Sequence, residues 1–315
     1  MTSILGRAME SGTAVAPTTG PGTGPGSGRP GGSAPGAPTA PVRRKRKRPS
    51  GWHFVLAPIA LLFVIPFFQM FMASVSPAAE LISYPPPFIP SRIDFGGFVG
   101  LFTTTDILHW LLNTVIVAST AIASHLVLCS LAGYGFARLK FQGRTFGIFL
   151  IIATIMIPTQ LLMIPTYILF SRLGLIDGLG AAIVPWLASA FGIFLMRQFF
   201  LSLPSDLEEA GTIDGANRWQ VFWHIVLPLA RPALATLAIF TLLGSWNDLV
   251  WPLIAINDND AFTLQLGLAN FQSTRRTQWE LLMAGNVVAT LPLILFFLVA
   301  QKQFVATMTL SGMKG

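Results

Sequence analysis

The chain has 315 residues, of which 53% are hydrophobic and only 10% are charged. Soluble domains carry about 25% charged residues, because a folded chain of this size needs a polar exterior. The composition therefore excludes a soluble globular protein and favours a membrane protein, despite the net charge of +7.

The first 49 residues form a segment of their own. Residues 1–42 are rich in Gly, Pro, Ser, Thr and Ala, with too few large apolar side chains to offset the entropy cost of ordering. A run of bases follows, from Arg43 to Arg48, so the positive charge is concentrated rather than spread over a folded face. We predict a disordered basic cytoplasmic tail over residues 1–49, of unknown role, and no nucleic-acid partner.

A run of bases before an apolar stretch can also open a secretory signal peptide. The stretch over residues 54–75 has 22 residues, which is long for a signal peptide and right for a helix across a bilayer. We therefore expect it to be the first membrane span rather than a cleaved signal.

Six apolar segments fit the length of about 20 residues that a membrane-spanning helix needs. Backbone groups find no water in hydrocarbon, so each segment must satisfy its own hydrogen bonds as a helix. The predicted fold is an all-α integral membrane protein with six transmembrane helices. The predicted spans cover residues 54–75, 110–134, 145–168, 181–200, 229–250 and 281–301.

The distribution of bases predicts the orientation of these spans. If the N-terminus lies in the cytoplasm, the inner segments carry 16 of the 20 Lys and Arg residues. Cytoplasmic loops of membrane proteins are enriched in these residues, so both termini are predicted to lie inside. Eight prolines fall in or beside the spans, and the sequence leaves open whether they kink helices around a cavity or are simply tolerated.

If this membrane protein is a transporter, its sequence shows no energy source of its own. It has no G-x-x-x-x-G-K-[ST] phosphate-binding loop, so it cannot hold ATP in that way. The alternative to a transporter driven by ATP is an ion-coupled secondary transporter. Such a protein usually carries ionic groups inside its spans. Here only Asp248 lies near a span, at the predicted outer end of the fifth, and His125 is more simply a structural residue. We expect a partner protein to supply the energy.

Residues 201–228, called the acidic loop below, follow the fourth predicted span. The loop holds four of the 13 acidic residues, at positions 206, 208, 209 and 214. Ser205 followed by Glu208 predicts a capping box and a helix that begins at 205–206, with the acids placed favourably in its first turn. Gly215 ends that helix, and Asn217 starts a second one over about 218–225.

Two short helices joined at a glycine predict a compact knob beneath the membrane. An amphipathic helix in the membrane interface is the alternative, but the anionic inner leaflet would repel its acids. A protein partner with a basic cleft fits the loop better.

The acidic loop resembles the EAA loop of ABC importer permeases, in which E-A-A is followed by three residues, a glycine, nine residues and I-x-L-P. The matching residues are Glu209-Ala210-Gly211, Gly215 and Ile225 to Pro228. Gly211 departs from the pattern, which usually has alanine there. Residues 132–138, 244–248 and 312–315 also look like the sugar-importer branch of that family. The resemblance covers residues 50–315 and is to the six-helix permease of maltose-type, type I importers.

The resemblance implies an inner-membrane permease subunit, not an enzyme, of an ATP-driven, binding-protein-dependent importer for sugars of the oligosaccharide class. In that family the loop docks on a separate ATPase dimer, which binds ATP and Mg²⁺, so this chain binds no cofactor directly. The implied partners are that ATPase, a second and different permease subunit, an extracytoplasmic sugar-binding protein and membrane lipid. An importer for glycerol phosphate or a polyamine stays open, and the sequence does not identify the sugar.

The resemblance also carries roles onto single residues. Glu209 is expected to pair with a base of the ATPase, and Gly215 to be the hinge between the two loop helices. The residues expected to couple the chain to the ATPase are Glu208, Glu209, Ala210, Gly211, Asp214, Gly215, Ala216, Phe222, Leu227 and Pro228.

A substrate path is expected near Asn113, Trp246 and Asn247, because sugars stack on aromatic rings and bond to amides. We expect no catalytic residue and no metal ligand. The single cysteine, Cys129, gives neither an internal disulfide nor a metal site.

Overall fold

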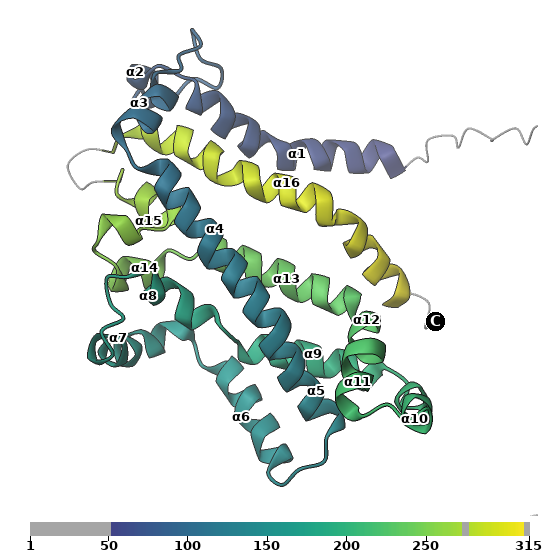
Figure 1. Cartoon of the computed structure of the whole chain (residues 1–315). Helices are drawn as coiled ribbons and strands as arrows, with labels where there is room; N and C mark the ends of the chain where they lie inside the picture. Colours follow the sequence, from purple (N-terminus) through teal and green to yellow (C-terminus); the bar gives the residue numbers. More distant parts are fainter. Residues whose placement is uncertain (1–51, 273–276, 312–315) are drawn as a thin grey trace, which may run out of the picture. The chain divides into compact units, whose positions relative to one another are not determined.

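The computed structural model describes residues 52–272 and 277–311, so the predicted tail over 1–49 and the end motif at 312–315 lie outside the described residues. Figure 1 shows the arrangement of the helices. The α-helices are α1 (Trp52–Ser74), α2 (Ala78–Leu81), α3 (Gly96–Thr104), α4 (Ile107–Ser124), α5 (Ser130–Arg138), α6 (Arg144–Met156), α7 (Met163–Arg172), α8 (Leu179–Ile183), α9 (Ala190–Ser202), α10 (Asp206–Ile213), α11 (Arg218–Val221), α12 (Leu227–Leu229), α13 (Arg231–Trp246), α14 (Val250–Ala255), α15 (Leu264–Ala269) and α16 (Trp279–Ser311). The π-helical turns are η1 (His125–Cys129) and η4 (Phe222–Val226), and the 3₁₀ turns are η2 (Thr159–Leu162), η3 (Val184–Trp186) and η5 (Asn259–Ala261).

The number of candidate spans agrees with the predicted six. Among the described residues, two bent helix pairs pass the same length and composition test as a span, α6 with η2–α7 at an angle of 98° and α11–α12 with α13 at 76°. Counting each bent pair as one span gives up to six. The four candidates that are not such bent pairs are Phe54–Ser74, Ile107–Arg138, Leu179–Ser202 and Trp279–Leu298.

The prediction of continuous helices is wrong at four places. Residues 157–158, 187–189, 230 and 247–249 are not helical, and the last of these breaks lies near the outer end of the fifth predicted span. Pro158 explains the first interruption, because proline has no backbone N–H and pushes the residue before it toward extended geometry. Ile157 has that geometry, with φ −82° and ψ 120°.

Buried apolar side chains gather in three clusters. The first includes Trp110 and Leu281 and joins α3, α4, α15 and α16. The second includes Phe200 and Phe222 and joins α5, α9 and the acidic loop. The third includes Trp251 and joins α7, α8 and α14. Other large apolar side chains, such as those of the α1 span, point outward, as expected where a helix faces lipid or another membrane subunit.

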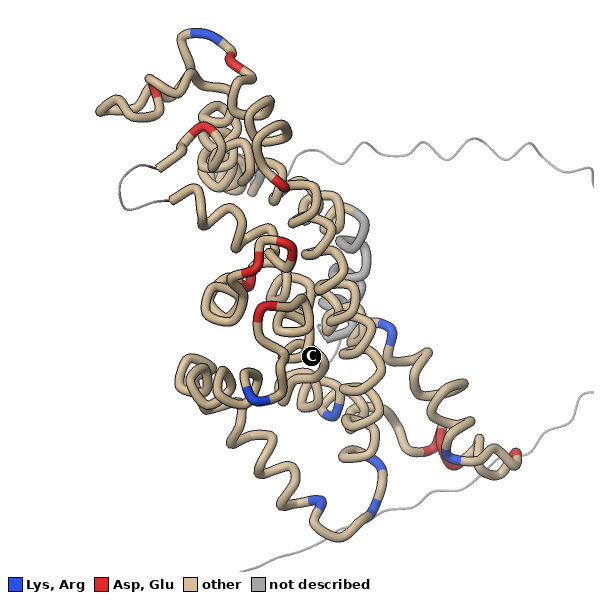
Figure 2. The backbone as a smooth tube through the Cα atoms, turned by 60° about the vertical axis from the view of Figure 1, so that its left-hand side comes forward, with Lys and Arg blue, Asp and Glu red and all other residues tan. Residues whose placement is uncertain are grey.

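The charged residues separate along the molecule. In Figure 2 most of the described Lys and Arg residues lie in the lower half and most of the Asp and Glu residues in the upper half. The acidic loop, which contains α10 and α11, is the exception in the lower half. A basic end that carries one acidic protrusion is the arrangement that the positive-inside rule and the loop composition together predict.

Helices α5 and α9 approach each other closely in the inner half of the molecule. A Cβ atom added at Gly133 of α5 would lie 2.7 Å from Met196 Cβ and 2.9 Å from the backbone nitrogen of Arg197. Only a glycine fits there without moving backbone atoms. At Gly135, two residues further on, the nearest atom would be 4.0 Å away.

We predict that Gly133→Ala lowers the thermal unfolding temperature of the purified chain, because overpacking costs about 1–3 kcal/mol. Gly135→Ala is the matched control, since both substitutions gain about 1 kcal/mol of helix propensity and only the first meets a backbone. Equal stability of the two variants would show that the α5–α9 contact does not need a glycine.

Candidate functional site

The acidic loop forms the predicted pair of short helices. α10 begins at Asp206, and Gly215 has φ +87°, a left-handed conformation that favours glycine. Asn217 then caps α11 in a complete capping box: its side chain accepts from Gln220 N at 2.9 Å, and its backbone N–H donates to Gln220 Oε1 at 2.8 Å. The helix–glycine–helix geometry predicted from the sequence is confirmed.

The capping box predicted at Ser205 and Glu208 is wrong, although the helix starts where expected. Ser205 is itself in helical conformation, and its hydroxyl lies 3.4 Å from Asp206 Oδ1 instead of capping the helix. Glu208 does not turn back toward Ser205 because its carboxylate is used by residues of another helix.

Glu208 links the acidic loop to the inner end of α5. Arg138 Nε lies 2.7 Å from Glu208 Oε1, a charge contact rather than an aligned hydrogen bond, and the Tyr134 hydroxyl donates to Glu208 Oε2 at 3.1 Å. Arg138 also donates to the Leu203 carbonyl at 2.6 Å. Both charged side chains are mostly buried, with 17% and 18% exposed, so solvent screens this pair less than a surface pair. A single arginine therefore holds both ends of the α9–α10 connection.

Phe222 anchors the second half of the loop. Its side chain is 2% exposed, with its ring centroid 5.0 Å from that of Tyr134 and 6.4 Å from that of Phe200. Tyr134 belongs to α5 and Phe200 to α9, so the ring is held between the inner ends of two spans. Burying an aromatic side chain of this size stabilises by about 1.5–3 kcal/mol.

The face of the loop that points away from the membrane helices is acidic and apolar. Glu209 and Asp214 are exposed, as is Ile213, which is 85% exposed, together with Trp219 at 59%. A cleft of about 750 Å³ runs between α10 and α11, lined in part by Glu209, Ile213 and Arg218. Exposed large apolar groups beside acids suit a protein partner that offers both basic and apolar side chains.

The expected coupling residues divide into two groups. One group packs inward, and the other is exposed on the loop. The inward group, buried or half-buried, is Glu208, Gly211, Ala216, Phe222 and Leu227; the exposed group is Glu209, Ala210, Asp214, Gly215 and Pro228.

Gly211, the departure from the family pattern, has a packing role. A Cβ atom there would lie 2.5 Å from Ile225 Cδ1, so the glycine lets the loop helices approach closely.

Sequence reasoning missed Arg138 and Tyr134 as members of this site. The motif at 132–138 was a signal that this segment matters. Its pairing with Glu208, 70 or more positions away, leaves no trace in local spacing.

The three residues expected along a substrate path are not gathered around one space. The Asn113 amide donates to the carbonyls of Asp260 and Phe262, both at 2.9 Å, and is buried. Trp246 is 4% exposed and donates to the Ala289 carbonyl at 3.1 Å. Asn247 is exposed. Their role in the path remains a prediction, and for Asn113 and Trp246 a sugar contact would first require breaking these bonds.

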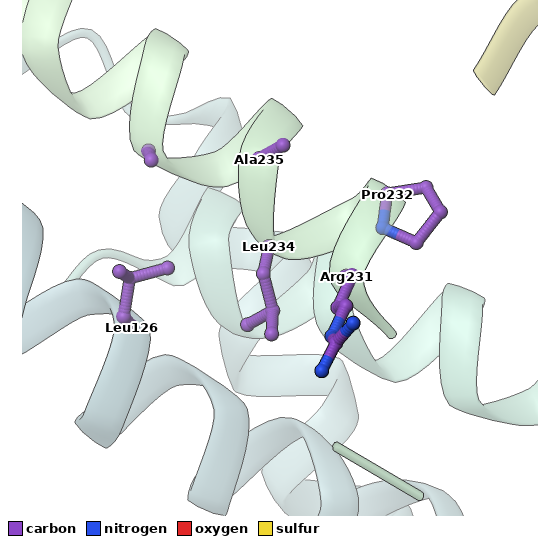
Figure 3. A pocket seen from close by; sticks show the side chains of 6 residues that line it. Leu126, Arg231, Pro232, Leu234 and Ala235 are labelled. Carbon is purple, nitrogen blue, oxygen red and sulfur yellow. The ribbon is translucent and has the colours of Figure 1, made fainter. Parts of the chain in front are cut away.

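An open groove of about 420 Å³ lies between η1 and the start of α13 (Figure 3). Leu126, Leu234 and Ala235 line it, and Arg231 is its only charged group. It lacks the hydroxyl and amide groups that orient a sugar. No group of three or more His, Cys, Asp or Glu residues that could bind a metal occurs in the described part of the chain.

We predict that Glu208→Gln lowers the stability of the purified chain by about 1–3 kcal/mol, because Arg138 loses its buried counter-charge. Thermal unfolding in detergent measures the effect. Glu209→Gln, one residue along the same helix and exposed, serves as the control and should leave stability within about 0.5 kcal/mol of the parent. If the two variants have the same unfolding temperature, the Arg138–Glu208 pair does not stabilise the fold.

Comparison with known proteins places this loop in context. Residues 126–309 match the family model described as "Binding-protein-dependent transport system inner membrane component". The chain is 33% identical to the arabinooligosaccharides transport system permease protein AraQ of Halalkalibacterium halodurans, covering 87% of this chain and 100% of that protein. It is 33% identical to the lactose transport system permease protein LacG of Rhizobium radiobacter, over 81% and 92% of the two chains.

A solved structure agrees with the fold. The crystal structure of a bacterial ABC transporter involved in the import of the acidic polysaccharide alginate contains a chain that is 25% identical to this one, with a TM-score of 0.70 over 79% of this chain and 93% of that chain. The family match extends through the acidic loop and the spans on both sides of it. The chain belongs to the family of inner-membrane permease components of binding-protein-dependent ABC transport systems.

Proposed function

We propose that the chain is the permease subunit of an importer for oligosaccharides, driven by a separate ATPase that docks on the acidic loop. The observation that carries the proposal is the loop geometry: an exposed acidic and apolar face on one side, and Phe222 and Glu208 fixed to α5 and α9 on the other. A surface with these two sides receives a partner and passes its displacement to two spans.

The energy source belongs to another protein because this chain has no phosphate-binding loop. The family is one of transport components rather than enzymes. Exposed Glu209 is the residue we assign to a basic group of the ATPase, and Gly215, where an added Cβ atom would have no neighbour within 4 Å, is the hinge between α10 and α11.

Three further partners complete the proposed importer. They are a second permease subunit that closes the path, an extracytoplasmic protein that delivers the sugar, and lipid around the exposed apolar spans. Family membership by itself supports the delivery protein, since the family is named for its dependence on one.

The oligosaccharide class is supported by the relatives named above, which are named for the transport of arabinooligosaccharides and lactose. The test is uptake of radiolabelled arabinotriose and lactose by cells that lack this gene, with and without a restored copy. Glycerol 3-phosphate and putrescine test the alternatives. Loss of sugar uptake that the restored copy repairs supports the proposal, and unchanged uptake of both sugars contradicts it.

We predict that Glu209→Ala reduces uptake about tenfold or more, because a charge-assisted bond contributes about 1.5–3 kcal/mol to docking. The amount of ATPase that copurifies with the chain should fall in parallel, while the amount of chain in the membrane stays constant. Full copurification of the ATPase with Glu209→Ala would remove this residue from the docking surface.

Gly215→Pro should end uptake while the protein remains inserted, because proline cannot adopt φ +87°. Gly143→Pro is the matched control, since Gly143 has φ +82° and also sits in a short connection with open space around it. Normal uptake in the Gly215→Pro strain would refute the hinge.

A further inference from the structure

A cavity of about 440 Å³ lies where three interrupted spans meet. Thr159 follows the interruption at 157–158, Ser189 ends the one at 187–189, and Asp248 is the middle residue of the one at 247–249; all three line the cavity. In membrane proteins irregular backbone is tolerated only where it is buried in protein or lines a water-filled space, and broken helices of transporters commonly frame substrate sites.

Asp248 is half-buried among apolar neighbours, where an ionic group is costly and usually functional. Its Oδ2 accepts from Trp186 Nε1 at 3.0 Å. A carboxylate offers about four acceptor positions, so this bond leaves acceptor capacity on the cavity side.

The tryptophan rings beside Asp248 are held in place. A Cβ atom at Gly244 would lie 2.5 Å from Trp186 Cη2, so the glycine makes room for that ring. Trp251 donates to the Ala181 carbonyl at 2.9 Å and packs edge-on against Phe170 at 5.3 Å. Fixed aromatic walls, a carboxylate and the hydroxyls of Thr159 and Thr166 are the chemistry that binds polyhydroxyl compounds.

The charge of the lining selects among such compounds. The residues that line this cavity in the described structure include Asp248 and no Lys or Arg. A uronate or a phosphate would therefore meet an unopposed negative charge in a setting that screens poorly. The volume lies within the range of about 300–1,000 Å³ that small-molecule sites occupy.

We infer that this cavity is a saccharide subsite of the permease, in which Asp248 accepts hydrogen bonds from hydroxyls of an uncharged sugar and acidic sugars are excluded. The inference rests on the proposed import of sugars and adds to it a site in this subunit and a charge preference. The cavity shares no residue with the acidic loop, which lies on other helices.

Protection of a cysteine inside the cavity tests the subsite directly. The chain has one cysteine, Cys129, and it is fully buried, so Thr166→Cys introduces a single accessible thiol. In vesicles that contain the complete importer, lactose or arabinotriose should slow the labelling of this thiol by N-ethylmaleimide. Digalacturonate at the same concentration should not. Gln142→Cys, exposed in the connection between α5 and α6, is the control whose labelling the sugars leave unchanged.

Asp248→Asn in the Thr166→Cys background should raise the sugar concentration needed for protection about tenfold, and should lower uptake to a similar degree. The amide oxygen still accepts from Trp186, so the ring stays in place. Asp260→Asn makes the same charge change on an exposed outer turn and should alter neither value. Protection that is unaffected by Asp248→Asn, or equal protection by digalacturonate, overturns the subsite.

The outcomes separate this inference from the proposed function. If cells import the sugar but no neutral sugar protects the thiol at position 166, the subsite is refuted and the proposed importer function is not. Cells that import neither sugar refute the proposed function, whatever the labelling shows.

Discussion

The burial of Phe222 between α5 and α9 is the contact on which the acidic loop depends. Its ring closes an aromatic group with Tyr134 and Phe200, and the Arg138–Glu208 pair fixes the other half of the loop to the same end of α5. With both halves attached, a displacement of the loop must carry α5 and α9 with it or break these contacts. The exposed residues are free to bind a partner because the inward ones already hold the fold.

The membrane half of the chain follows a second constraint, which is the cost of polar groups in hydrocarbon. Three spans have breaks, at 157–158, 187–189 and 247–249, that meet at one cavity, whereas the break at the buried Ala230 does not line it. An aspartate beside these breaks is tolerated where the cavity supplies water, ligand or fixed donors such as the Trp186 N–H. In the proposed importer, the loop is the docking surface for the ATPase and the cavity is a polar opening between the spans.

Sequence reasoning succeeded for features that depend on residues close together in the sequence. Apolar length predicted the spans, and Gly215 with Asn217 predicted the break and restart of the loop helices, because a left-handed turn and a capping box depend on residues a few positions apart. It failed at Ser205, where a distant arginine takes the carboxylate that would have completed the cap. It singled out Asp248 near a span but did not predict its bond to Trp186, because the two residues are 62 positions apart and come together only through the packing of separate spans. The bend at Pro158 was partly predictable. The proline indicates where the helix can break, but the angle between α6 and α7 depends on tertiary packing.

Site-directed crosslinking from the exposed face of α10 tests the central claim most directly. Because Cys129 is buried, Ile213→Cys places the single accessible thiol of the chain on that face and leaves Glu209 in place. A thiol-reactive photo-crosslinker attached there, in membranes of cells that import the sugar, is predicted to join the chain to a nucleotide-binding ATPase subunit. The same reagent at Asp260→Cys on the outer turn should not. Attachment only to lipid, in cells whose import is intact, would contradict the account.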